Sequence, residues 1–217
     1  MNWKNALHAA VAALLVSLPA VSQTKTPVRE ERVLAFIHQA NVFEIEAAKL
    51  ALANSSSDAV KSFAEEMVKD HQAADAQLRT YGSAHDIDID SLSNQLDQVD
   101  EDRLENERRD KTVGSATGEW AWTWENTLRK KSDDTNELAK LRNLRDSAFD
   151  REYARAMIDG HQNVSNRLRD AEQGRRPGRS LARPISPDLK SLIDGLLPTV
   201  QHHLEMAQAL EATVAKA

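Results

Sequence analysis

Four long segments of the chain carry apolar residues at steps of three and four positions, the spacing that gathers them on one face of an α-helix. These segments cover about residues 27–53, 57–82, 138–168 and 186–210. A helix with a single apolar face is marginal alone in water and has to bury that face against a partner. We therefore predict an all-α protein in which the four helices pack as a four-helix bundle.

Local signals mark the ends of these segments. Ser56 or Ser57 can cap the start of the second helix, and Gly82 can end it. Ser186 stands directly before Pro187, a pair that favours the start of the fourth helix. The scarcity of glycine and proline, seven and six residues, is typical of a chain built mainly from helices.

The chain between the second and third segments fits no bundle helix. Its run HDIDID, residues 85–90, has the acid spacing of a calcium loop, but Ser91 and Asp97 stand where such a loop needs glycine and glutamate. Residues 103–134, with the tryptophan-bearing run EWAWTW, are predicted to be a long insertion between the second and third helices. We expect its tryptophans to pack onto the bundle, and a ligand-binding platform is the alternative.

The N-terminus has the pattern of a secretory signal peptide over residues 1–22. Lys4 precedes an apolar run at 6–18 that is too short to span a bilayer, and small residues stand before a cut after Ser22. We predict a single mature domain of residues 23–217 that is exported to the periplasm or the outer membrane. The alternative is a buried N-terminal helix.

Charge and composition limit the partners of the mature chain. Cleavage removes Lys4 and no acidic residue, so the net charge of −6 becomes −7, which disfavours nucleic acid as a partner. No segment of the mature chain is apolar enough to span a membrane, and the lack of cysteine excludes disulfides and a cysteine-linked lipid anchor. The loop at 174–187 is basic, and its arginines are candidate contacts for anionic envelope polymers: Arg175, Arg176, Arg179 and Arg183.

A nine-residue pattern occurs twice. FAEEMVKDH at 63–71 and YARAMIDGH at 153–161 each place a histidine four positions after a methionine on the predicted inward face. In HHLEM at 202–206 the order is reversed. Because all these histidines lie near the middle of their helices, we expect them to fall in one layer of the bundle.

These motifs resemble a bacterial family of exported proteins known as domain of unknown function 4142, whose members are often labelled outer-membrane or ferritin-like proteins. The similarity is carried by EIEAAKLA at 44–51, VKSFAEEMVKDH at 60–71, FDREYARAMIDGH at 149–161 and LPTVQHHLEMA at 197–207. The resemblance implies a ferritin-like bundle and no established activity. The family pattern maps onto Glu44, Met67, Asp70, His71, Tyr153, His161 and His203. The chain departs from the family in His202, the insertion and the basic loop.

The sequence does not favour a di-iron enzyme. Such a centre in a bundle normally uses Glu-x-x-His on two helices. Here Val68 stands three positions before His71, and Ile158 stands three positions before His161. We therefore expect neither a ferroxidase nor an oxygenase.

Seven residues remain as candidate metal ligands: Glu44, Met67, His71, Met157, His161, His202 and His203. Imidazole with thioether suits copper, and imidazole with carboxylate suits zinc or iron. The alternative is packing without a cofactor, because methionine fills gaps and an acid such as Glu44 or Asp70 can satisfy a buried histidine. The residues by themselves favour packing.

Two functions are therefore open. The favoured one is an exported, noncatalytic bundle with an envelope-related or stress-related role, acting through contacts with envelope polymers or with copies of itself. The other is a periplasmic bundle that binds copper, zinc or iron through histidine, methionine and glutamate in its core.

Overall fold

The computed structural model describes residues 28–92, 134–173 and 185–216. The predicted signal peptide, nearly all of the predicted insertion and most of the basic loop lie outside these residues. The described residues form four long helices: α1 (Val28–Asn54), α2 (Asp58–Ala84), α5 (Asp146–Glu172) and α6 (Pro187–Val214). Residues 89–92 and 134–143 are also helical.

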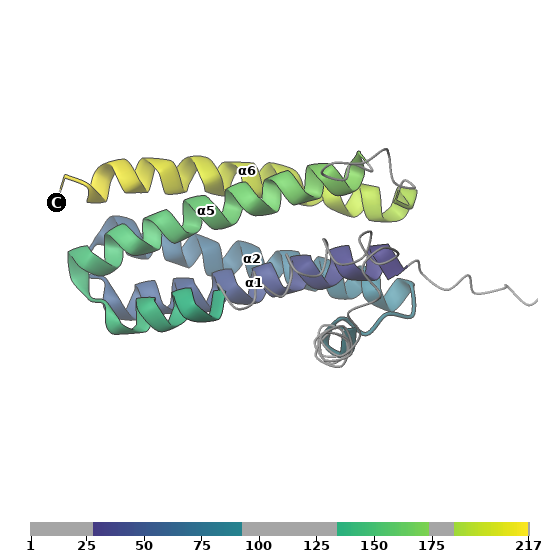
Figure 1. Ribbon diagram of the computed structural model, residues 1–217, viewed down its shortest axis with the longest axis horizontal. Coiled ribbons are helices and arrows are strands. Elements are labelled where there is room, and N and C mark those ends of the chain that lie inside the picture. The colour runs from purple at the N-terminus through teal and green to yellow at the C-terminus, as the bar shows by residue number, and fades with distance from the viewer. Residues whose placement is uncertain (1–27, 93–133, 174–184, 217) are drawn as a thin grey trace, which may run out of the picture.

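The four long helices pack as a bundle made of two antiparallel hairpins. α1 and α2 form one hairpin and α5 and α6 form the other, and the two lie side by side (Figure 1). α1 also packs against α5, and α2 packs against α6. The predicted all-α helical bundle is confirmed.

Side chains at the helix starts fix where α2 and α6 begin. The Ser57 hydroxyl accepts a hydrogen bond from the Val60 amide at 3.4 Å, and the Ser186 hydroxyl accepts one from the Leu189 amide at 3.2 Å. Both caps agree with the prediction. Glu30 of α1 accepts hydrogen bonds from the amide and the hydroxyl of Ser186, at 2.7 and 2.9 Å. A carboxylate at a helix N-terminus is favourable, and this one ties the start of α1 to the start of α6.

The third predicted helix is divided in the structure. Leu141 belongs to the helical stretch 134–143, and α5 begins only at Asp146. Arg145 between them is extended, with φ of −141°, and Asp146 has a positive φ of 46°. The Asn54 amide at the end of α1 donates to the Leu141 carbonyl at 3.2 Å and anchors the short helix. The apolar spacing did not reveal this break, because it continues on both sides of it.

The core contains two apolar clusters at different positions along the bundle. Members of the first, near the start of α1, include Leu34, Phe36, Leu78, Leu168 and Ile193. Members of the second, near the α1–α2 turn, include Phe63, Met67, Phe149, Tyr153 and Leu210. The histidine layer between them consists of buried polar residues that belong to neither cluster: Asn41, Glu44, His71, His161 and His203.

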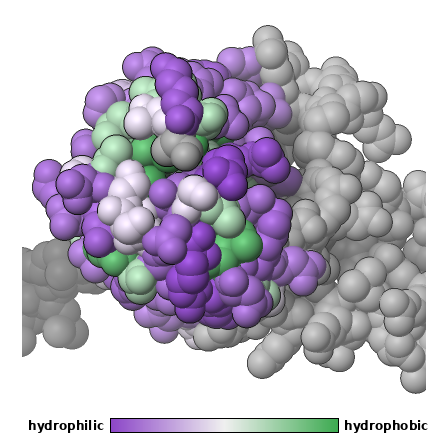
Figure 2. All heavy atoms as spheres, turned by 90° about the vertical axis from the view of Figure 1, so that its left-hand side faces the viewer, coloured by the Kyte–Doolittle hydropathy of each residue, from purple (hydrophilic) through white to green (hydrophobic). Residues whose placement is uncertain are grey.

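The surface at one end of the bundle is mainly polar. Figure 2 views the end at which the α1–α2 turn and the C-terminus lie, and hydrophilic residues cover most of its described surface. Among the described residues, no helix combines the length and the hydropathy that a bilayer crossing requires.

Candidate metal centre

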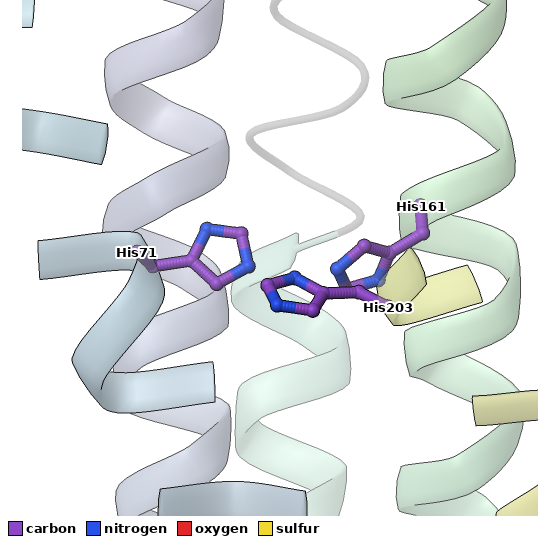
Figure 3. Close-up of side chains that lie close together, drawn as sticks. All are labelled: His71, His161 and His203. Carbon is purple, nitrogen blue, oxygen red and sulfur yellow. The ribbon is translucent and has the colours of Figure 1, made fainter. Parts of the chain in front are cut away.

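Three helices each contribute one histidine to the histidine layer. His71 of α2, His161 of α5 and His203 of α6 are all buried. The ring centroids lie 5.6 Å apart for His71 and His161, 5.2 Å for His71 and His203, and 5.3 Å for His161 and His203. The rings turn toward one another (Figure 3), and one nitrogen from each lies within 4.8 Å of the others. We call these three residues the histidine triad.

Partners outside the triad orient His71 and His161. The Nδ1 atom of His71 lies 3.0 Å from the side-chain oxygen of Asn41 on α1. The Nδ1 atom of His161 lies 2.8 Å from the backbone carbonyl oxygen of Met157 and 3.7 Å from a carboxylate oxygen of Glu44. Amide oxygens only accept hydrogen bonds, so both Nδ1 atoms carry a hydrogen and donate it.

His203 is held through its other nitrogen. Its Nε2 atom lies 3.2 Å from a carboxylate oxygen of Asp70 and donates to it. A neutral imidazole carries one hydrogen, so its second nitrogen keeps a lone pair. The lone pairs of the triad are therefore on Nε2 of His71, Nε2 of His161 and Nδ1 of His203.

Within the described part of the chain, none of these three lone-pair nitrogens has a hydrogen-bond partner, and all three are buried. They cannot satisfy one another, because each of them needs a donor. A metal ion between them would accept all three lone pairs at once. Metal-binding histidines usually donate their other ring nitrogen to a carboxylate, a carbonyl or water, as the triad histidines do here.

Burial keeps two of the rings neutral at pH 7. Desolvation lowers the pKa of His71 well below its ordinary value, and the neighbouring His161 and His203 lower it further. Desolvation and His161 also lower the pKa of His203 to about 4, although Asp70 opposes this shift. Neutral imidazole is the form that binds a metal ion.

Two carboxylates flank the triad. Asp70 contacts His203, and the buried Glu44 lies beside His161. Gly160 makes room for Glu44, since a Cβ atom at that position would lie only 2.8 Å from the Glu44 Oε1 atom. In their ionised forms the two acids carry two negative charges, which would offset the charge of a divalent ion at the triad.

The structure brings together four of the predicted ligands: Glu44, His71, His161 and His203. Met67 and Met157 are buried in the second core cluster and not in the histidine layer. Each stands one helical turn before its histidine, which shifts its side chain into the neighbouring layer.

The His202 side chain is 60 % exposed and lies 3.7 Å from Glu66. Successive helical residues point about 100° apart, so His203 faces the core and His202 does not.

Asn41 and Gly160 complete the centre and were not among the predicted residues. Asn41 is a polar residue three positions before Glu44 on the inward face of α1, and this placement is a signal that could have revealed it. Gly160 directly precedes His161, but its close approach to Glu44 depends on the packing of α1 against α5.

The fold and the site define a helical-bundle protein with a buried cluster of three histidines on three of its helices. The chain belongs to the family described as Domain of unknown function (DUF4142), whose sequence profile matches residues 16–112 and 124–210. The unmatched residues between these segments, 113–123, fall inside the predicted insertion. No curated protein and no solved structure matches the chain.

Proposed function

We propose that this protein binds one divalent transition-metal ion at the histidine triad, and that zinc suits the site best. The proposal rests on three buried lone-pair nitrogens that lack a hydrogen-bond partner among the described residues. A buried acceptor without a donor is unfavourable, and three in one place need a common explanation. A bound metal ion would explain all three acceptors, because one ion can bind all three nitrogens.

The distances are compatible with a site that closes on the ion. Zinc binds histidine nitrogen at about 2.0–2.1 Å, so nitrogens on one tetrahedral ion lie about 3.4 Å apart. One nitrogen from each triad histidine lies within 4.8 Å of one nitrogen of each of the other two. Movements of about 1 Å by each ring would bring these nitrogens into that range.

The donor set favours zinc over reduced copper. Three imidazoles and one open position are a common arrangement for zinc. The thioethers of Met67 and Met157 pack in the second core cluster, so the site lacks the soft ligands that favour reduced copper. Copper(II) generally binds nitrogen sites more tightly than zinc, so the supply of each metal would decide which one occupies the site.

Two further parts of the proposal concern location and fold family. Export is supported by the signal-peptide pattern at residues 1–22. A ferritin-like topology is supported by α2 and α5, which run in the same direction and therefore need a connection that returns along the bundle (Figure 1).

Metal binding accounts for the histidine layer better than packing alone does. In a packing role, neighbouring protein groups or water would satisfy both ring nitrogens, and each triad histidine has one nitrogen without a protein partner in the described residues. A role through the surface or through self-assembly does not require three such nitrogens in one layer of the core.

The test is metal analysis of the full chain, exported and purified without a histidine tag. We expect about one zinc or copper ion per chain, and a rise in melting temperature when zinc is added to the metal-free protein. The double variant His71→Leu/His203→Leu should bind no metal. His202→Leu is the matched control, because it removes an exposed histidine next to the triad, and it should bind as the wild type does.

The proposal is wrong if the metal-free protein melts at the same temperature with and without zinc, copper(II), cobalt(II) and iron(II). It is also wrong if the double variant keeps the metal. Circular dichroism of both variants confirms that a loss of metal is not a loss of helical structure.

A further inference from the structure

A cavity of about 150 Å³ extends from the triad to the surface between α2 and α6. The triad histidines line its inner end, together with Asn41 and Glu44. At its outer end lie Ala73 and Gln77 of α2 and Gly195 of α6, all of which are exposed. A metal ion on the triad would therefore have an open side that faces a path to solvent.

The walls between the two ends are mainly apolar. Asp70 and Thr199 add polar groups, and the apolar residues come mostly from α1, α5 and α6: Ile37, Ala40, Val164, Leu168, Leu196 and Val200. A cavity of about 150 Å³ with such walls accommodates one benzene-sized ring. Water would satisfy a metal at the inner end, but it would find few hydrogen-bond partners along these walls.

We infer that the cavity binds a small neutral molecule that coordinates the metal through one nitrogen or oxygen atom and packs a compact apolar body against the walls. This inference rests on the proposed metal function. A single ring matches the cavity volume of about 150 Å³. Neutral ligands are preferred, because the cavity walls are mainly apolar and the two acids Glu44 and Asp70 also line the cavity, which disfavours an anion there.

Gly195 provides a way to close the outer end without disturbing the helix. A Cβ atom built on this residue has no heavy atom within 4 Å, so a side chain at this position enters open space. Gly195→Leu should place an aliphatic side chain in the outer part of the cavity. Gly195→Ala is the matched control, since it removes the glycine but adds only a methyl group.

The experiment uses the full chain loaded with cobalt(II), whose visible absorption reports a change of ligand. Imidazole, a neutral single ring, and azide, a thin anion, are titrated separately at pH 8 and at full cobalt occupancy. We expect both to change the spectrum saturably, with imidazole binding more tightly than azide. In Gly195→Leu, imidazole should bind at least tenfold more weakly, azide should change less than threefold, and Gly195→Ala should resemble the wild type.

Each other result overturns a specific part of the inference. A cobalt-loaded protein whose spectrum ignores both ligands has no accessible coordination position, so the cavity inference fails while the metal centre stands. Tighter binding of azide than of imidazole rejects the neutral ligand class. Equal imidazole affinity in the wild type and Gly195→Leu rejects entry between α2 and α6. A protein that takes up no cobalt, zinc or copper overturns the metal function and the inference together.

Discussion

Two buried histidine sites in this bundle pair imidazole with carboxylate and differ in what the second ring nitrogen meets. His38 of α1 lies 2.7 Å from Asp75 through Nδ1 and 3.6 Å from Asp90 through Nε2. Arg79 binds both of these acids. In the triad, one nitrogen of each ring has a partner and the other has none among the described residues.

The partner of the second ring nitrogen distinguishes His38, a structural histidine, from the triad histidines, which are candidate metal ligands. At His38 both nitrogens face acids, so the ring connects α1 to α2 and to the short helix after α2, and the described residues place no group of three convergent metal ligands around it. Burial alone would raise the pKa of Asp75, but the hydrogen bonds from His38 and Arg79 outweigh burial and lower it. Burial and a nearby acid are common to both sites, so the second nitrogen is the informative feature.

The largest expected difference between the sites is in metal binding. His161→Leu should abolish the stabilisation by zinc, which for the wild type reaches about 4 kcal/mol when free zinc is 1,000-fold above Kd. His38→Leu should keep the full zinc effect, because His38 lies outside the triad and both of its ring nitrogens face carboxylates. Thermal melting with and without zinc measures both variants, and loss of the zinc effect in His38→Leu would contradict the distinction.

The second prediction is the pH dependence of the metal-free protein. His71 and His203 have lowered pKa values in the folded state, so the unfolded chain binds more protons than the folded one below about pH 6.5. Their contribution to stability is complete above pH 6.5 and is lost as the pH falls toward 4, by up to about 1.4 kcal/mol per pH unit for each histidine.

Urea denaturation at several pH values between 7 and 4 measures this loss. The double variant His71→Leu/His203→Leu should show a flatter profile, because the acids elsewhere titrate equally in both proteins. Parallel profiles for the variant and the wild type would show that the triad does not titrate in this window.

The third prediction concerns the acids that contact the histidines. Asp70→Asn should weaken zinc binding 10-fold to 100-fold, as is typical for the loss of a carboxylate that orients a metal-binding histidine. Asp75→Asn makes the same chemical change beside His38 and should leave zinc affinity unchanged. Competition with a chromophoric chelator gives both dissociation constants, and equal effects of the two substitutions would place Asp70 outside the metal centre.

The smallest expected effect comes from Gly160→Ala. The added Cβ atom would lie 2.8 Å from Glu44 Oε1, so the carboxylate has to move away from its position beside His161. We expect zinc affinity to fall severalfold, by less than tenfold, with little change in melting temperature, because alanine also favours the helix by about 1 kcal/mol. The same chelator competition detects this change, and an unaltered affinity would show that the position of Glu44 does not matter to the ion.

The sequence by itself determined the all-helical bundle and the inward placement of His71 and His161. Apolar spacing of three and four residues is a local property, and it reports which face of a helix is buried whatever the neighbours are. The starts of α2 and α6 were equally predictable, because Ser57 and Ser186 cap their helices through bonds to residues three positions on.

Only the tertiary structure decided which candidates meet and which nitrogen of each ring remains available. Asn41, Glu44 and Asp70 lie 30, 117 and 133 positions from the histidines that they contact, so no local pattern could assign these partners. Met67 and Met157 share the inward face with their histidines but fall one layer away, because a helical turn advances about 5.4 Å along the axis. The helix period therefore predicts which way each side chain points. The axial register between packed helices decides which of these side chains meet.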